Sequence, residues 1–147
     1  MVRSLLAYGA YSDLVRARLV QAQYFKDPFD METYLKKNIF LPFINNEVES
    51  KRDSQLAENM KTLDQFVMFM WLEDSVVVPR ESSHFGVYNA TTKTIIPLKD
   101  QPLYQEDWIG LKYLDEMGKL VMKSIPGDHM HITDDLLSDI VKEYLLT

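Results

Sequence analysis

Two side chains in this sequence have the types and positions that acid–base catalysis requires. Asp74 follows the apolar run from Phe66 to Leu72, and His129 follows the run from Leu120 to Met122 and the turn at Pro126-Gly127. In such a pair, the carboxylate fixes the tautomer of the imidazole and stabilises the imidazolium. The imidazole takes a proton from a nucleophile or from water and later delivers it to a leaving group.

Both residues also have an ordinary structural explanation. Asp74 can be a turn-forming aspartate that bonds its own backbone, and His129 can be a loop histidine with local hydrogen-bond partners. The chain order of Asp74 and His129 matches the last two members of the Ser, Asp, His order in α/β hydrolases. Many sheets carry acidic residues at strand ends for loop geometry alone, so this order leaves both explanations open.

The elements that must position this pair are two strands. The run from Phe66 to Leu72 has no polar break and is rich in aromatic residues, which predicts a strand buried on both faces. Leu120 to Met122 predicts a second buried strand, which Pro126-Gly127 ends. Ligands of open α/β sheets bind beyond the carboxyl ends of the strands, so we predict that Asp74 and His129 lie at such an edge.

Helices are predicted around these strands, which together give an α/β fold class. The predicted helices cover 12–25, 31–37, 54–63, 109–117 and 133–146. Thr133 is placed to cap the last helix, and Gly118 to end the one before it. The run from Ile39 to Ile44 is expected to be irregular or a short helix because Pro42 interrupts it. Segment 45–54 is predicted to be a surface loop, 101–108 a loop and 93–98 a short strand.

The composition argues against several classes of function. The 147 residues, 46% of them hydrophobic, indicate one folded domain. A net charge of −6 with scattered basic residues argues against nucleic-acid binding. No apolar run approaches the roughly 20 residues of a transmembrane helix, and the first residues do not resemble a secretory signal peptide. The absence of cysteine excludes disulfides and thiol nucleophiles. Asn89, in the sequon Asn89-Ala90-Thr91, is a candidate for glycosylation.

Four blocks of this sequence resemble the C-terminal portion of palmitoyl-protein thioesterases, in the same order. The blocks are AYGAYSDLVRARLVQAQYFKDP, FVMFMWLEDSVVVPRESSHFGVYN, TIIPLKDQPLYQEDWIGLKYLDEMGKLV and GDHMHI, and the resemblance runs from about Leu6 to Leu146. Members of that family are α/β hydrolases, lysosomal and secreted. They cleave the thioester that joins a fatty acyl chain to cysteine in proteins.

The resemblance implies a fold, a site and a substrate class for this chain. Residues 65–147 would form the C-terminal strands and helices of an α/β-hydrolase sheet. Residues 1–64 would form a helical insertion that covers the sheet and makes an acyl groove. The triad aspartate of the family falls on Asp74 and its triad histidine on His129. The implied partner is an S-palmitoylated protein or another acyl thioester, the implied location is lysosomal or secreted, and no cofactor is implied.

The sequence departs from the family pattern where the nucleophile is needed. Such a hydrolase uses a serine in G-x-S-x-G, and no serine in this chain lies between two glycines at that spacing. Ser124 precedes Pro126 inside a predicted strand, which is poor geometry for a nucleophile. Val78 stands where we expect an acid in the family. We therefore predict that the nucleophile half of the fold precedes Met1, and that the chain alone is inactive and aggregation-prone or needs a partner such as that half.

Two alternatives from other classes of function are open. A non-catalytic binding module would keep the acyl groove and hold a lipid chain or a lipidated peptide. A metal site would use His129 and His131 with Asp128 or Asp134. The sequence places no third histidine or cysteine near these residues, so we assign no metal.

Overall fold

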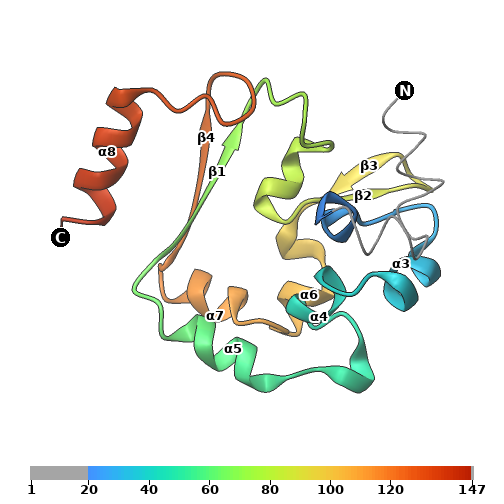
Figure 1. The fold of residues 1–147 in the computed structure, drawn as a ribbon. Coiled ribbons are helices and arrows are strands. Elements are labelled where there is room, and N and C mark those ends of the chain that lie inside the picture. Colours follow the sequence, from blue (N-terminus) through green and yellow to red (C-terminus); the bar gives the residue numbers. More distant parts are fainter. Residues whose placement is uncertain (1–19, 147) are drawn as a thin grey trace.

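A parallel pair of strands lies at the centre of the computed structural model, which describes residues 20–146 (Figure 1). The strands β1 (Phe66–Trp71) and β4 (Leu120–Ile125) pair in register, beginning with Phe66 opposite Leu120. Both predicted strands are thus confirmed, and because they are parallel they end at the same edge. In Figure 1 the helix α8 (Asp134–Tyr144) lies on one side of the pair and the other elements lie on the opposite side.

The predicted burial of β1 on both faces, and the predicted burial of β4, are wrong for the part of the chain that the structure describes. Met68 is buried in β1, but the other residues of that strand are only partly buried, and β4 has no buried residue. Within residues 20–146, each of these strands pairs with a single neighbour. The helix α8 beside them has no buried residue either. A two-stranded sheet with this cover keeps much of its apolar surface accessible.

The hydrophobic core lies at the start of the two strands. It contains five buried residues from the connection that precedes β4, namely Leu98, Leu103, Ile109, Leu111 and Leu114. These residues belong to or flank η4 (Leu98–Asp100), α6 (Pro102–Gln105) and α7 (Leu111–Glu116). Phe66 and Leu120 pack against this cluster. Because each is the first residue of its strand, the core anchors the N-terminal ends of β1 and β4.

Helix α5 (Ser54–Lys61) approaches the core at Gly110, the residue before α7. Gly110 has a φ of 85°, and a Cβ at this position would lie 2.9 Å from the carbonyl oxygen of Ala57. Glycine is required here both for the left-handed backbone and for the close approach. The side chain of Asp53 caps α5 by accepting a hydrogen bond from the amide of Gln55 at 2.9 Å. The helix predicted from residue 54 is confirmed.

The segment before α5 contains short helices and turns. These are η1 (Val20–Tyr24), α3 (Met31–Lys37), α4 (Leu41–Ile44) and η2 (Glu49–Lys51). The helix predicted at 31–37 is confirmed, and the proline-containing run forms the short helix α4. Most of the helix predicted at 12–25 lies outside the described residues, and its final part is the 3-10 turn η1.

A buried asparagine joins two of these elements. The Nδ2 of Asn38 donates to the carbonyl oxygens of Gln23 at 3.0 Å and Phe25 at 3.2 Å. Its Oδ1 accepts from the amides of Phe40 and Leu41, at 2.9 and 3.1 Å. These hydrogen bonds cap the start of α4 and attach it to η1 and to the residue that follows η1.

A second buried asparagine lies in the segment 45–54, which was predicted to be a surface loop and is exposed from residue 49 onward. Asn46 is 3% exposed and has a left-handed φ of 52°. Its Nδ2 donates to the carbonyl oxygens of Asp53 and Trp108, at 2.9 and 2.8 Å. Its Oδ1 accepts from the amide of Asp53 at 2.9 Å. Asn46 is buried because its amide group satisfies backbone groups from two segments that are far apart in sequence.

A short antiparallel hairpin, β2 (Val87–Asn89) and β3 (Thr94–Ile96), follows η3 (Arg80–His84). It confirms the strand predicted within 93–98. The Oδ1 of Asn89 accepts from the amides of Thr91 and Thr92, at 2.9 and 3.1 Å, and so shapes the hairpin turn. The predicted glycosylation site therefore lies in a turn, and its occupancy stays a prediction.

The last helices of the chain follow the predicted capping residues. Thr133 accepts from the amide of Leu136 at 3.2 Å and caps α8, and Gly118 takes a left-handed φ of 69° after α7. Helix α6 lies in the segment 101–108, which was predicted to be a loop, and it starts at Pro102. Pro favours the first turn of a helix, where no amide donor is needed. None of the helices within residues 20–146 is long and apolar enough to cross a bilayer.

Candidate active site

The two predicted site residues come together at the edge where β1 and β4 end. Oδ2 of Asp74 lies 2.9 Å from Nδ1 of His129. The side chain of Asp74 is 3% exposed, whereas that of His129 is 33% exposed. The carboxylate of Asp74 is thus shielded from water, whereas the ring of His129 is partly accessible to solvent. Nε2 is the ring nitrogen that does not face Asp74. An acid–base pair requires this geometry.

Asp74 is at the same time the turn-forming aspartate of the ordinary explanation. Its Oδ1 accepts hydrogen bonds from the amides of Val76 and Val77, both at 2.9 Å. The two explanations are compatible because the carboxylate has two oxygen atoms. One oxygen shapes the turn after β1, and this fixes the direction in which the other oxygen meets His129.

The electrostatic surroundings of Asp74 assign the proton of this contact. Burial acts to raise the pKa of Asp74, but hydrogen bonds from His129, Val77 and Val76 outweigh it and hold the pKa below its usual value. Asp74 is therefore ionised at neutral pH and can only accept. Nδ1 of His129 must donate the 2.9 Å hydrogen bond, which leaves Nε2 of the neutral ring free of a proton. Nε2 is the atom that can act as a base.

Further polar contacts join the two turns that carry this pair. The amide of Glu73 donates to the carbonyl oxygen of Gly127 at 3.1 Å, and the amide of Gly127 donates to the carboxylate of Glu73. Oδ1 of Asp128 accepts from the amide and the hydroxyl of Ser75, both at 3.2 Å, and from the amide of His129 at 2.7 Å. Sequence reasoning did not predict these contacts, because they depend on the register of β1 and β4.

The other candidate residues do not join this site. Ser124 lies inside β4 opposite Met70, as a strand residue and not at a turn. The main chain of His131 accepts from Nε1 of Trp71 at 3.3 Å. In the part of the chain that the structure describes, no group of three or more His, Cys, Asp or Glu side chains is placed to hold a metal ion. The structure therefore gives no support to the metal alternative.

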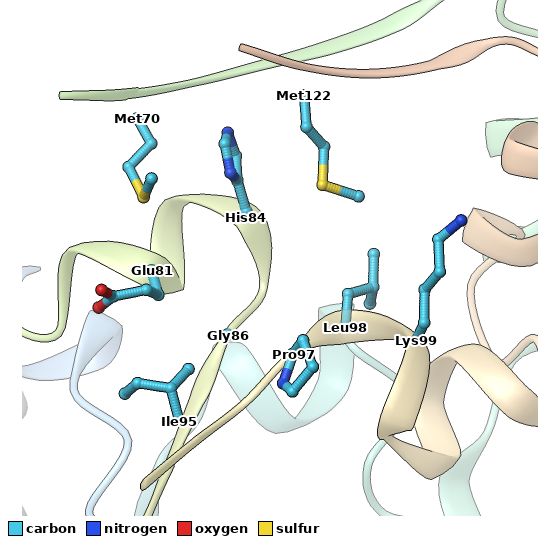
Figure 2. Close-up of a pocket in the computed structure, with 9 residues that line it drawn as sticks. All are labelled: Met70, Glu81, His84, Gly86, Ile95, Pro97, Leu98, Lys99 and Met122. Atoms are coloured by element: carbon cyan, nitrogen blue, oxygen red, sulfur yellow. The ribbon is translucent and has the colours of Figure 1, made fainter. Parts of the chain in front are cut away.

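A pocket of about 420 Å³ lies beside the strand pair, and neither Asp74 nor His129 lines it. Figure 2 shows Met70 and Met122 reaching it from the strands, with His84 between them. Nε2 of His84 lies 3.3 Å from the carbonyl oxygen of Met68. The pocket is therefore a feature separate from the acid–base pair.

The fold and the site together define the class of this protein. Its helices and its small parallel and antiparallel sheets are those of an α/β fold, and an aspartate that orients a histidine is typical of hydrolases that activate a nucleophile. The chain belongs to the palmitoyl protein thioesterase family, whose family model matches residues 1–129. The resemblance found in the sequence is thus confirmed.

Similar proteins from three organisms agree with this assignment. The chain is 41% identical over 147 residues to palmitoyl-protein thioesterase 1 of Caenorhabditis elegans, a match that covers 99% of this chain and 49% of that protein. It is 34% identical over 144 residues to palmitoyl-protein thioesterase 3 of Dictyostelium discoideum, covering 97% and 48%. It is 38% identical over 104 residues to lysosomal thioesterase PPT2-B of Xenopus laevis, covering 71% and 36%. The chain thus spans about half the length, or less, of these relatives.

Proposed function

We propose that this chain carries the acid and the base of a thioesterase, with Asp74 as the orienting acid and His129 as the general base. The observation that carries the proposal is the 2.9 Å contact between Oδ2 of Asp74 and Nδ1 of His129. Two relatives named palmitoyl-protein thioesterase support the reaction class. The proposed substrate is an S-palmitoylated protein or another acyl thioester.

The proposed reaction has two halves, and His129 moves a proton in each. Nε2 takes the proton of a serine hydroxyl while the serine oxygen attacks the thioester carbonyl. The C–S bond then breaks, and His129 gives the proton to the leaving sulfur, which departs as a thiol. In the second half, Nε2 takes a proton from water as the water oxygen attacks the acyl-serine. His129 returns the proton to the serine, and the fatty acid is released. The ionised Asp74 stabilises the imidazolium in both halves.

The serine of this mechanism is not proposed among these 147 residues, because they contain no G-x-S-x-G. The hydroxyl of Ser75 donates to Asp128, and Ser124 lies inside β4. We propose that a part of the fold outside these residues supplies the serine and the oxyanion donors, and that the chain alone does not turn over a thioester. Turnover of an S-palmitoyl peptide by the purified chain, abolished by His129→Ala, would show this to be wrong.

A hybrid protein tests the proposed roles directly. The chain replaces the matching half of the C. elegans relative, and release of thiol from an S-palmitoyl peptide is measured. The hybrid is expected to be active, and Asp74→Asn is expected to lower kcat by about four orders of magnitude, since the tautomer is then no longer fixed. His129→Ala is expected to cost at least as much. The control, Asp64→Asn, changes an exposed aspartate outside the site. Full activity of a folded His129→Ala hybrid would refute the proposal.

A lysosomal location is proposed for the protein. Relatives from Xenopus laevis, Drosophila melanogaster and Mus musculus are named lysosomal thioesterases. A glycan on Asn89, the last residue of β2, would be consistent with delivery to that compartment. Expression in animal cells tests both points. The chain is expected in lysosomes with a glycan that Asn89→Gln removes, and a diffuse cytosolic signal would contradict the location.

A second candidate function is acyl-chain binding without catalysis, through the helical insertion proposed at 1–64. The observation that favours it is the apolar surface of this segment, where Phe29 is 76% and Ile39 60% exposed. Exposed apolar side chains mark a binding surface where they form one contiguous patch. Titration with a fluorescent palmitate analogue is expected to saturate and to weaken in Ile39→Glu. Absence of saturable binding by the folded chain would exclude this function.

A further inference from the structure

We infer that Asp128 is a positioning residue, whose carboxylate links the turn after β1 to the main chain of His129 and so keeps Nδ1 of the imidazole facing Asp74. The inference rests on the proposed function only in taking His129 as the base. The orientation of the ring can be measured without any activity.

Three hydrogen bonds to one oxygen atom make this link. Oδ1 of Asp128 accepts from the amide and the hydroxyl of Ser75, both at 3.2 Å, and from the amide of His129 at 2.7 Å. We call these three contacts the Asp128 bridge. Ser75 directly follows Asp74, and Asp128 directly precedes His129. The bridge therefore joins the two turns at the positions next to the acid–base pair.

The backbone on both sides of His129 needs such a link to keep its conformation. Gly127 has a φ of 114° and Met130 a φ of 50°, so the turn passes through the left-handed region twice within four residues. Met130 is not a glycine, and a side chain makes this region unfavourable. Such conformations persist where the surrounding structure fixes them. The Asp128 bridge fixes the backbone at Asp128, the residue between Gly127 and His129.

The role of Asp128 differs from that of Asp74. Asp128 contacts His129 through the main-chain amide, whereas Asp74 contacts the ring nitrogen Nδ1. Hydrogen bonds from the amide of His129, and then from the amide and hydroxyl of Ser75, lower the pKa of Asp128, so its carboxylate is ionised at neutral pH and accepts all three. Asp128 thus acts on the imidazole through the backbone that carries it.

The tautomer of His129 reports this role directly. Long-range ¹H–¹⁵N correlation spectra of the purified chain distinguish Nδ1–H from Nε2–H, and they are compared at an alkaline pH at which the spectra themselves show a neutral ring. The unsubstituted chain is expected to show the Nδ1–H form. Asp128→Ala is expected to convert at least half of His129 to the Nε2–H form and to speed hydrogen exchange of the Ser75 amide about tenfold. Asp128→Asn keeps an oxygen acceptor and is expected to keep most of the Nδ1–H form.

Two further variants keep the test decisive. Ser75→Ala removes only one donor of the Asp128 bridge, so it changes the turn little. In this variant a fraction of His129 is expected in the Nε2–H form. The variant thus tests the inference even if the Asp128→Ala chain does not fold. Asp64→Asn is the matched control and should leave the tautomer unchanged. The inference is overturned if folded Asp128→Ala or Ser75→Ala keeps the Nδ1–H form of the unsubstituted chain. It is also overturned if Asn and Ala at position 128 have equal effects. An inactive unsubstituted hybrid would fault the proposed function instead, and the tautomer shifts in the purified chain would still support the inference.

Discussion

Substitution of Asn46 is expected to destabilise this chain strongly. The side chain makes three hydrogen bonds, two as donor to the carbonyl oxygens of Asp53 and Trp108 and one as acceptor from the amide of Asp53. It is 3% exposed, so water does not replace these partners easily. Asn46→Ala therefore leaves the carbonyl oxygen of Trp108 and the amide of Asp53 without these partners, whereas the carbonyl oxygen of Asp53 keeps a hydrogen bond from the amide of Leu56 at 3.3 Å.

The size of the effect follows from these contacts. Each buried group left without a partner costs about 1 to 3 kcal/mol, and alanine at the left-handed φ of 52° adds about 1 kcal/mol. Because two groups lose their partners and can regain water in part, we expect a total loss of about 3 to 6 kcal/mol in the free energy of unfolding. Asn46→Gly loses the same hydrogen bonds without the backbone cost. Its loss should be smaller by about 1 kcal/mol.

Urea unfolding followed by tryptophan fluorescence measures these losses, and Trp108 lies at the affected contact. With an m-value of about 2 kcal/mol per M, Asn46→Ala is expected to lower the midpoint by about 1.5 to 3 M. The control is Asn59→Ala in α5, where the exposed side chain accepts a hydrogen bond from Gln55 at 2.8 Å. This substitution should stay within about 0.5 kcal/mol of the unsubstituted chain.

The reasoning about Asn46 is refuted by either of two results. One is a loss below about 1 kcal/mol for Asn46→Ala, which would mean that Asp53 and Trp108 find other partners at little cost. The other is an equal loss for Asn59→Ala, which would mean that the assay reports a general effect of the substitution and not the buried contacts.

Three other predictions concern single residues. Gly110→Ala is expected to lower the free energy of unfolding by about 2 to 4 kcal/mol, because a Cβ there would lie 2.9 Å from a backbone oxygen. Gly118→Ala is expected to lower it by only about 1 kcal/mol, because a Cβ there would meet nothing within 4 Å. Equal losses in urea unfolding would contradict this. The pKa of Asp74 is lowered in the folded chain, so the ionised carboxylate stabilises the fold. This stabilisation is complete above about pH 4 and is lost as the pH falls through the folded pKa. Asp74→Asn should therefore lose less stability between pH 7 and pH 2 than the unsubstituted chain, and parallel pH profiles of the urea midpoint would show the reasoning to be wrong. The hydrogen bond to Asp115 raises the pKa of Tyr104 to about 12, so Tyr104→Phe should remove an ultraviolet phenolate transition near that pH and leave the rest of the titration unchanged. An unchanged titration near pH 12 would contradict this.

Local patterns were sufficient to predict most elements of the fold. Thr133 caps α8, as its position before an amphipathic segment predicted, and the unbroken apolar run at 66–72 forms β1. The strand ends also predicted the place of the site. Parallel strands in register end at one edge, so Asp74 and His129 could be expected there from the order of elements alone. Their catalytic roles remain proposals.

The features that sequence reasoning missed depend on contacts between distant segments. Nothing local distinguishes Asn46 from the polar residues beside it, because its partner Trp108 lies on another part of the chain. The same holds for the contact between Asp128 and Ser75, which exists only once β1 and β4 are paired. The burial of the strands was overestimated because an apolar run indicates a strand but not how many neighbours cover it. Helix α6 was missed because four residues are too few to show a period.

The core cluster between Leu98 and Leu114 has a consequence for the order in which this chain folds. Its residues are close in sequence, whereas pairing β1 with β4 joins Phe66 to Leu120 and closes a long loop. Contacts with short loops form sooner because they lose less chain entropy. We expect pulsed hydrogen exchange to show protection of α7 before β4, and simultaneous protection would contradict this. Asp74 and His129 would then meet only at the end of folding, so partly folded chains would contain the core without the acid–base pair.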